Sequence, residues 1–151
     1  MNDFALARVS LAREEGSGGS RSAVEFFDFI VDGASLRDQL RTPNIGVLSD
    51  KCPSVEFARR LVQEDADPLL DGLSAIYGCR ECLDTLCGGQ ATTVEIVGDR
   101  VHWSEIQAYS IDLSVDDPTK QLNLRATRVG PFEFDRAQYE GAIEPFLSSR
   151  A

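Results

Sequence analysis

The sequence predicts an α+β fold, in which an antiparallel sheet of about five or six strands carries two or three helices packed on it. A chain of 151 residues fits one domain, and a domain of this size buries enough surface to form a hydrophobic core. The turn Gly98-Asp99 lies between two strand-like segments and predicts a β-hairpin. Apolar residues at helical spacing near the C-terminus predict a helix that covers such a sheet. Hairpins outnumber crossover connections in this pattern, which favours an antiparallel sheet.

Two strands are expected near the N-terminus. Residues 4–13 mix apolar and polar side chains in a strand-like way, and residues 23–31 are rich in β-branched and aromatic side chains. The glycine- and serine-rich stretch 14–22 between them predicts a flexible loop that joins an antiparallel pair. No segment resembles a domain linker, so residues 1–151 are expected to form one globular domain.

Two helices are expected next. Ser35, followed three residues later by Asp38, predicts an N-cap with an acidic first turn for a short helix. Residues 53–64 carry apolar side chains at helical spacing, and Pro53 suits the first turn of a helix.

The remaining segments predict strands and a final helix. Residues 73–77 are interpreted as a short strand, although their apolar residues also fit a helical face. Residues 121–129 alternate apolar and polar side chains, which predicts a half-buried strand. Asp135 and Gln138 resemble a capping box at the start of the C-terminal helix, which Pro145 is expected to weaken. The apolar stripe of this helix comprises Tyr139, Ala142, Ile143, Phe146 and Leu147.

The hairpin register places the sole histidine. A two-residue turn between residues 92–97 and 100–106 pairs Glu95 with His102 on the polar face of the hairpin. We therefore expect His102 on the solvent side, away from any metal site.

The charge distribution argues against nucleic acid and membranes as partners. Twenty-five acidic and 15 basic residues give a net charge of −10, and a surface of this sign repels phosphate backbones and anionic lipids. Residues 1–60 carry nine acids and eight bases, whereas residues 61–151 carry 16 acids and seven bases. The acidic part is either a solubilising face or a patch that binds a protein partner with a basic surface.

The termini and the cysteines bear on the compartment. No basic run followed by an apolar stretch occurs at the N-terminus, and no apolar run has membrane-spanning length, so a cytoplasmic protein is expected. In a reducing compartment the four cysteines are expected as thiols or metal ligands more than as structural disulfides.

Three of the cysteines form a compact cluster. Cys79, Cys82 and Cys87 follow the pattern C-x-x-C-x-x-x-x-C between glycines, and a tight turn can aim their sulfurs at one point. Such thiolate-rich sites bind zinc, because convergent soft ligands offset the dehydration of the ion. A complete signature needs a fourth ligand. Cys52 is the preferred candidate, and Asp84 or water is the alternative.

Other interpretations of the cluster stay open. The cysteines can be small apolar side chains at a sharp turn, without any ligand. They can also form the dithiol of a thiol oxidoreductase, for which Arg80 would lower a thiol pKa while Glu81 and Asp84 would raise it. No catalytic residue is assigned, because a lone histidine leaves serine and cysteine nucleophiles without a positioned base.

Residues 77–104 resemble a set of small uncharacterised bacterial proteins. The resemblance rests on the pattern C-x-x-C-x-D-x-x-C-G, which continues into a hairpin that ends in V-x-W at Trp103. Residues 134–140 also look like the start of the C-terminal helix of those proteins. The resemblance implies a shared fold and a bacterial source, and it implies no activity. The matching positions are Cys79, Cys82, Asp84, Cys87, Gly88 and Trp103.

Together these observations predict a non-enzymatic interaction module with a cysteine knuckle, the segment 79–88, that zinc stabilises. Two alternatives belong to other classes. One is a small thiol oxidoreductase that uses the C-x-x-C dithiol. The other is an acidic immunity or inhibitor protein that binds a basic toxin or enzyme.

Overall fold

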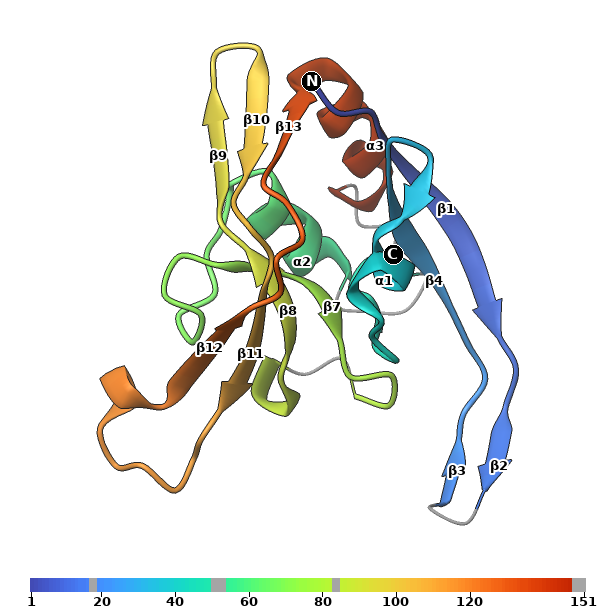
Figure 1. Ribbon diagram of the computed structural model, residues 1–151, viewed down its shortest axis with the longest axis vertical. Coiled ribbons are helices and arrows are strands. Elements are labelled where there is room, and N and C mark those ends of the chain that lie inside the picture. The colour runs from blue at the N-terminus through green and yellow to red at the C-terminus, as the bar shows by residue number, and fades with distance from the viewer. Residues whose placement is uncertain (17–18, 50–53, 83–84, 148–151) are drawn as a thin grey trace.

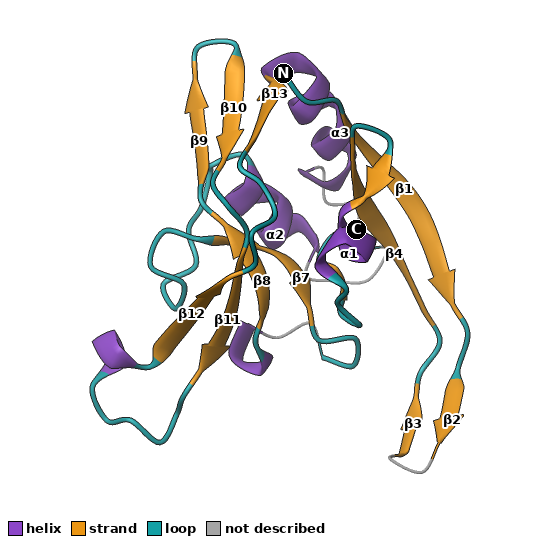
Figure 2. Cartoon of the chain, viewed as in Figure 1, coloured by secondary structure: helices purple, strands orange, loops and turns teal. Residues whose placement is uncertain are grey.

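The computed structural model describes residues 1–16, 19–49, 54–82 and 85–147. Over these residues the strands fall into four sheets, and three α-helices accompany them (Figures 1 and 2). The expected single antiparallel sheet of about five or six strands is therefore wrong. The described strands form sheets of five, three, three and two members, in a mixed fold of helices and strands.

The largest sheet has five antiparallel strands. In spatial order they are β12 (Leu122–Ala126), β11 (Gln107–Ile111), β8 (Gly89–Thr92), β7 (Ser74–Gly78) and β6 (Ile45–Gly46). Strand β7 confirms the strand interpretation of residues 73–77. Strand β12 confirms the strand expected at 121–129, but its half-buried character is wrong, because β12 lies at the edge of the sheet and Leu124 is 50% exposed.

A bent hairpin explains why the strands divide. In spatial order the second sheet contains β13 (Phe132–Asp135), β10 (Arg100–Trp103) and β9 (Val94–Val97). Only Thr93 separates β8 from β9, and at this bend its carbonyl accepts a hydrogen bond from the Ser104 N–H at 3.0 Å. One continuous hairpin thus supplies β8 and β11 to one sheet and β9 and β10 to another. The predicted pairing of Glu95 with His102 is confirmed.

The N-terminal sheet contains β1 (Phe4–Leu11), β4 (Val24–Val31) and β5 (Ala34–Ser35), and β1 and β4 are antiparallel as expected. The segment 14–22 between them, expected as a flexible loop, carries the two paired strands of the fourth sheet, β2 (Glu14–Gly16) and β3 (Gly19–Arg21). Figure 1 shows this two-stranded ribbon continuing from β1 and β4 away from the rest of the molecule.

The helices begin where their caps predict. For α1 (Leu36–Leu40), the Ser35 hydroxyl accepts a hydrogen bond from the Asp38 N–H at 3.1 Å. For α3 (Arg136–Leu147), the Asp135 carboxylate accepts one from the Gln138 N–H at 2.9 Å. The middle helix, α2 (Ser54–Leu61), ends three residues earlier than expected, and Pro53 lies outside the described residues.

An aromatic cluster in the core joins these elements. The Phe4 ring packs between Trp103, Phe134 and Tyr139, with ring centroids 4.8–5.8 Å apart. The Trp103 indole N–H donates to the Tyr139 hydroxyl at 3.1 Å, and this hydroxyl donates to the Leu61 carbonyl at 2.6 Å. Strand β1, the bent hairpin, α2 and α3 therefore share one core.

Candidate metal centre

The cysteine knuckle connects β7 to β8, so the sheet itself brings its two ends together. Gly78 at the end of β7 pairs with Gly89 at the start of β8. The two backbones approach so closely that a Cβ atom at Gly89 would lie 2.2 Å from the Tyr77 carbonyl oxygen. Glycine is therefore required at this position for the knuckle to close.

The three sulfurs of the knuckle converge. Cys79 directly follows β7, Cys82 lies in the turn after it, and Cys87 ends a short 3-10 helix, η1 (Thr85–Cys87). Their Sγ atoms all lie within 4.8 Å of one another, which is close enough to hold a metal ion. Figure 1 places this connection beside the base of the N-terminal ribbon.

One pair of sulfurs is closer than a metal would hold it. The Cys82 and Cys87 Sγ atoms are 2.6 Å apart. A disulfide bond is about 2.05 Å long. Two thiolates on a tetrahedral zinc ion, each about 2.3 Å from it, are about 3.8 Å apart. Metal binding would therefore open this pair by about 1 Å, whereas oxidation would close it.

Cys79 and Cys87 differ in acidity. Burial raises the pKa of Cys79, but hydrogen bonds from the N–H groups of Cys82 and Glu81 and from the two other thiols outweigh it and hold this pKa below its ordinary value. Hydrogen bonding with Cys82, burial and the negative charge of the neighbouring thiols raise the pKa of Cys87 to about 12. The cluster therefore favours a thiolate at position 79 over one at position 87, and a metal ion would have to displace the proton of Cys87.

The residues between the first two cysteines are fixed by the ribbon. The Arg80 guanidinium donates to the carbonyls of Ala12 and Ser22 at 2.7 and 2.8 Å, and it pairs with the Glu14 carboxylate at 2.6 Å. The Glu81 carboxylate accepts a hydrogen bond from the Ser22 N–H at 3.0 Å. From the sequence, Arg80 and Glu81 are expected only to modify thiol acidity, since no local signal points to partners about 60 residues away.

The other end of the knuckle is anchored by a nearly buried ion pair. The Thr85 hydroxyl donates to the Asp67 carboxylate at 2.8 Å, and this carboxylate also lies 3.3 Å from the Arg60 guanidinium. The side chains of Arg60 and Asp67 are only 15% and 5% exposed. Neither residue was identified from the sequence, because the pair joins a helix to a loop through tertiary packing alone.

The remaining site candidates lie elsewhere. Cys52 and Asp84, considered as fourth ligands, lie outside the described residues. His102 lies on β10, where its Nδ1 atom is 3.5 Å from the Glu133 carboxylate, and it is not part of the cysteine cluster. Its expected position away from the cysteines is confirmed.

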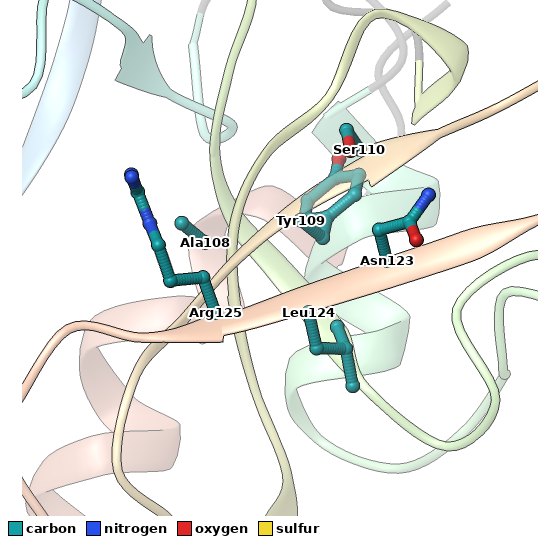
Figure 3. Close-up of a pocket in the computed structure, with 6 residues that line it drawn as sticks. All are labelled: Ala108, Tyr109, Ser110, Asn123, Leu124 and Arg125. Atoms are coloured by element: carbon teal, nitrogen blue, oxygen red, sulfur yellow. The ribbon is translucent and has the colours of Figure 1, made fainter.

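A hollow of about 280 Å³ lies on β11 and β12 (Figure 3). It is lined by Ala108, Tyr109, Ser110, Asn123, Leu124 and Arg125. These residues include no cysteine, histidine or carboxylate, so the hollow offers no acid-base pair and no metal ligand set.

Comparisons with known proteins yield no match to a protein-family model, a curated protein or a solved structure. Among the described helices, none has both the length and the apolar character needed to cross a membrane. The fold and the site therefore define a mixed α+β protein with a cluster of three cysteines that can hold a metal ion.

Proposed function

We propose that the protein is a non-enzymatic interaction module whose cysteine knuckle binds a zinc ion. The observation that carries this proposal is the convergence of the Cys79, Cys82 and Cys87 sulfurs within 4.8 Å on one short connection. Zinc suits this site because thiolates are soft ligands and zinc accepts tetrahedral coordination. We also propose that the protein is related to the small bacterial proteins that carry the same knuckle. We propose further that it is cytoplasmic, because a reducing compartment keeps the thiols reduced.

The ion would have a structural role. Arg80 and Glu81 lie between two of its ligands, and both side chains hold the base of the N-terminal ribbon. A bound ion restricts the knuckle and therefore the contact between the ribbon and the five-stranded sheet. The ribbon and the acidic residues that are in excess after residue 60 are then available to a protein partner with a basic surface.

Metal analysis of the full chain, purified without chelator, tests the zinc site. We expect about one equivalent of zinc in the wild type and a large loss in Cys82→Ser, because a structural zinc site needs its complete set of ligands. Cys52→Ser identifies the fourth ligand, since it lowers the zinc content only if Cys52 coordinates the ion. Less than about 0.2 equivalents in the wild type would contradict the zinc site.

A thiol oxidoreductase is the second candidate, and the 2.6 Å separation of the Cys82 and Cys87 sulfurs favours it. Exchange of this pair with a disulfide such as oxidised glutathione would form the Cys82–Cys87 S–S bond, break the S–S bond of the oxidant and transfer the two thiol protons to it, giving two glutathione thiols. The pair differs from the C-x-x-C dithiol of Cys79 and Cys82 expected from the sequence. Cys79 also follows a strand, whereas the thiols of C-x-x-C oxidoreductases lie at helix N-termini.

Equilibration with glutathione buffers, followed by alkylation and mass spectrometry, separates the two candidates. An oxidoreductase predicts a reversible disulfide between Cys82 and Cys87. A zinc site predicts three thiols that alkylate slowly until a chelator is added. Three thiols that alkylate readily without chelator and form no disulfide would exclude both.

A further inference from the structure

A hollow of about 400 Å³ between the ribbon, the segment after α1 and the knuckle is lined by three arginines and one carboxylate. We call this hollow the arginine pocket. Its arginines are Arg21, Arg37 and Arg80, and its carboxylate is Glu14. In a chain with a net charge of −10, such an excess of positive charge in one hollow is unexpected from composition.

Two of the three guanidinium groups are held in place mainly by carbonyls. Arg37 donates from Nε to the Asn44 carbonyl at 2.6 Å and from Nη2 to the Pro43 carbonyl at 3.1 Å. Arg80 donates to two ribbon carbonyls, and its side chain is only 7% exposed. Neutral carbonyls orient a guanidinium group without cancelling its charge. The pocket is therefore preorganised and still cationic.

The third guanidinium group is free to bind. Arg21 lies on β3, is exposed, and has no ion-pair or hydrogen-bond partner among the residues that the structure describes. Among the described residues Glu14 is the only carboxylate that lines the hollow, and it pairs with Arg80. Two positive charges remain after this pairing.

We infer that the arginine pocket binds a small organic ligand through an oxyanion head, a phosphate or a carboxylate. The planar fork of a guanidinium group matches both of these anions through paired hydrogen bonds. The volume is in the range of small-molecule sites. Leu11, Ala12 and Pro43 complete the lining and provide an apolar wall for the body of the ligand. The inference does not depend on zinc, because no cysteine is among the described residues that line the pocket.

Calorimetric titration of the full chain, in a chloride buffer of low ionic strength, tests the pocket. The phosphate arm uses inorganic phosphate and phenyl phosphate, and the carboxylate arm uses acetate and benzoate. We expect saturable binding in at least one arm, with the ring-bearing probe bound more tightly than the ringless one. The arm that binds more tightly identifies the head group.

Variants assign the binding to the pocket. Arg21→Ala should weaken binding about tenfold, because it removes a charge-assisted hydrogen bond without disturbing any contact inside the protein. The matched control is Arg125→Ala, which removes the same charge from an exposed arginine on β12 and should change affinity less than about twofold. Absence of saturable binding in both arms, or equal losses in the two variants, would overturn the inference. The metal content of the protein is not part of this readout, so the pocket and the zinc site can fail separately.

Discussion

At the scale of single residues, the knuckle depends on a close backbone contact that only glycine permits. The carbonyl of Tyr77 occupies the space that a side chain at position 89 would need. This contact holds the two ends of the knuckle together, and the convergence of the three sulfurs depends on it.

Gly89→Ala is therefore expected to destabilise the fold by about 1–3 kcal/mol, the usual range for overpacking against atoms that must shift. It should also lower the zinc content, because β7 and β8, between which the cysteine knuckle is held, must separate. Urea denaturation and metal analysis measure the two effects.

Gly141→Ala is the matched control for this substitution. Gly141 lies in α3, and a Cβ atom there would meet no other atom within 4 Å. Alanine should stabilise this helix by about 0.5–1 kcal/mol, because it has the higher helix propensity. If the two variants had the same stability, the close contact at position 89 would not be structurally important.

At the scale of elements, the structure reproduces the features that the sequence predicts from neighbouring residues. Features that depend on residues far apart in the sequence were not predicted. The caps at Ser35 and Asp135 and the register about Gly98-Asp99 were predictable, because each depends on residues only a few positions apart. The bend at Thr93 was not predictable, because a strand-like pattern of residues continues through it. The exposure of Leu124 was also missed, since alternation does not show whether a second layer covers the strand.

The start of α3 shows how a local motif acquires a long-range role. Gln138 does not complete a capping box with its side chain, since its amide oxygen accepts from the Phe4 N–H at 3.1 Å. Its amide nitrogen donates to the Asp3 carboxylate at 2.6 Å. The same residue therefore ties α3 to the start of β1. The first strand and the last helix of the described chain are joined in this way.

Helix α3 is also held by the Tyr139 hydroxyl, which makes Tyr139→Phe an informative change. The substitution leaves the Leu61 carbonyl and the Trp103 indole N–H without a partner in the core. We expect a loss of about 2–6 kcal/mol, because each of the two unsatisfied buried groups costs about 1–3 kcal/mol. Chemical denaturation measures it. A loss below about 0.5 kcal/mol would show that water or a local shift replaces both bonds.

At the scale of the whole molecule, the N-terminal residues connect two sheets. The Asn2 N–H donates to the Glu133 carbonyl at 2.6 Å on β13, and the Asn2 amide donates to the Asp32 carboxylate at 2.7 Å beside β4. The Asp3 N–H donates to the same carboxylate at 2.7 Å. These contacts link the N-terminal sheet to the sheet of β13, β10 and β9.

This link predicts a pH dependence of stability. The hydrogen bonds from the Asp3 N–H and the Asn2 side chain hold the pKa of Asp32 below its ordinary value of 3.8. A carboxyl group with a lowered pKa stabilises the fold above its unfolded pKa, and this contribution is lost as the pH falls through the folded pKa. Asp32→Asn should therefore show a shallower loss of stability than the wild type on acidification below about pH 4.

The control for this pH effect is Asp65→Asn, at an exposed carboxylate that accepts a hydrogen bond from the neighbouring Ala66 N–H at 2.8 Å and, among the described residues, from no other group. Denaturation midpoints between about pH 5 and 2 compare the three proteins. Identical acid profiles for the wild type and Asp32→Asn would show that the link between the two sheets does not depend on this charge.

The ribbon provides the last test of how the molecule is assembled. Its base is held by Arg80 and Glu81, so a zinc ion on the flanking cysteines would restrict the ribbon through these two side chains. Removal of the ion with a chelator should speed amide hydrogen exchange in residues 12–22, because opening of the knuckle then needs less free energy. Amides of β9 and β10 are the internal control, since neither strand contacts the ribbon through a hydrogen bond that the structure shows. Unchanged exchange in the ribbon of a protein shown to lose its zinc would mean that the ion stabilises the knuckle alone, and that the ribbon is held by the Arg80 contacts whatever the state of the cysteines.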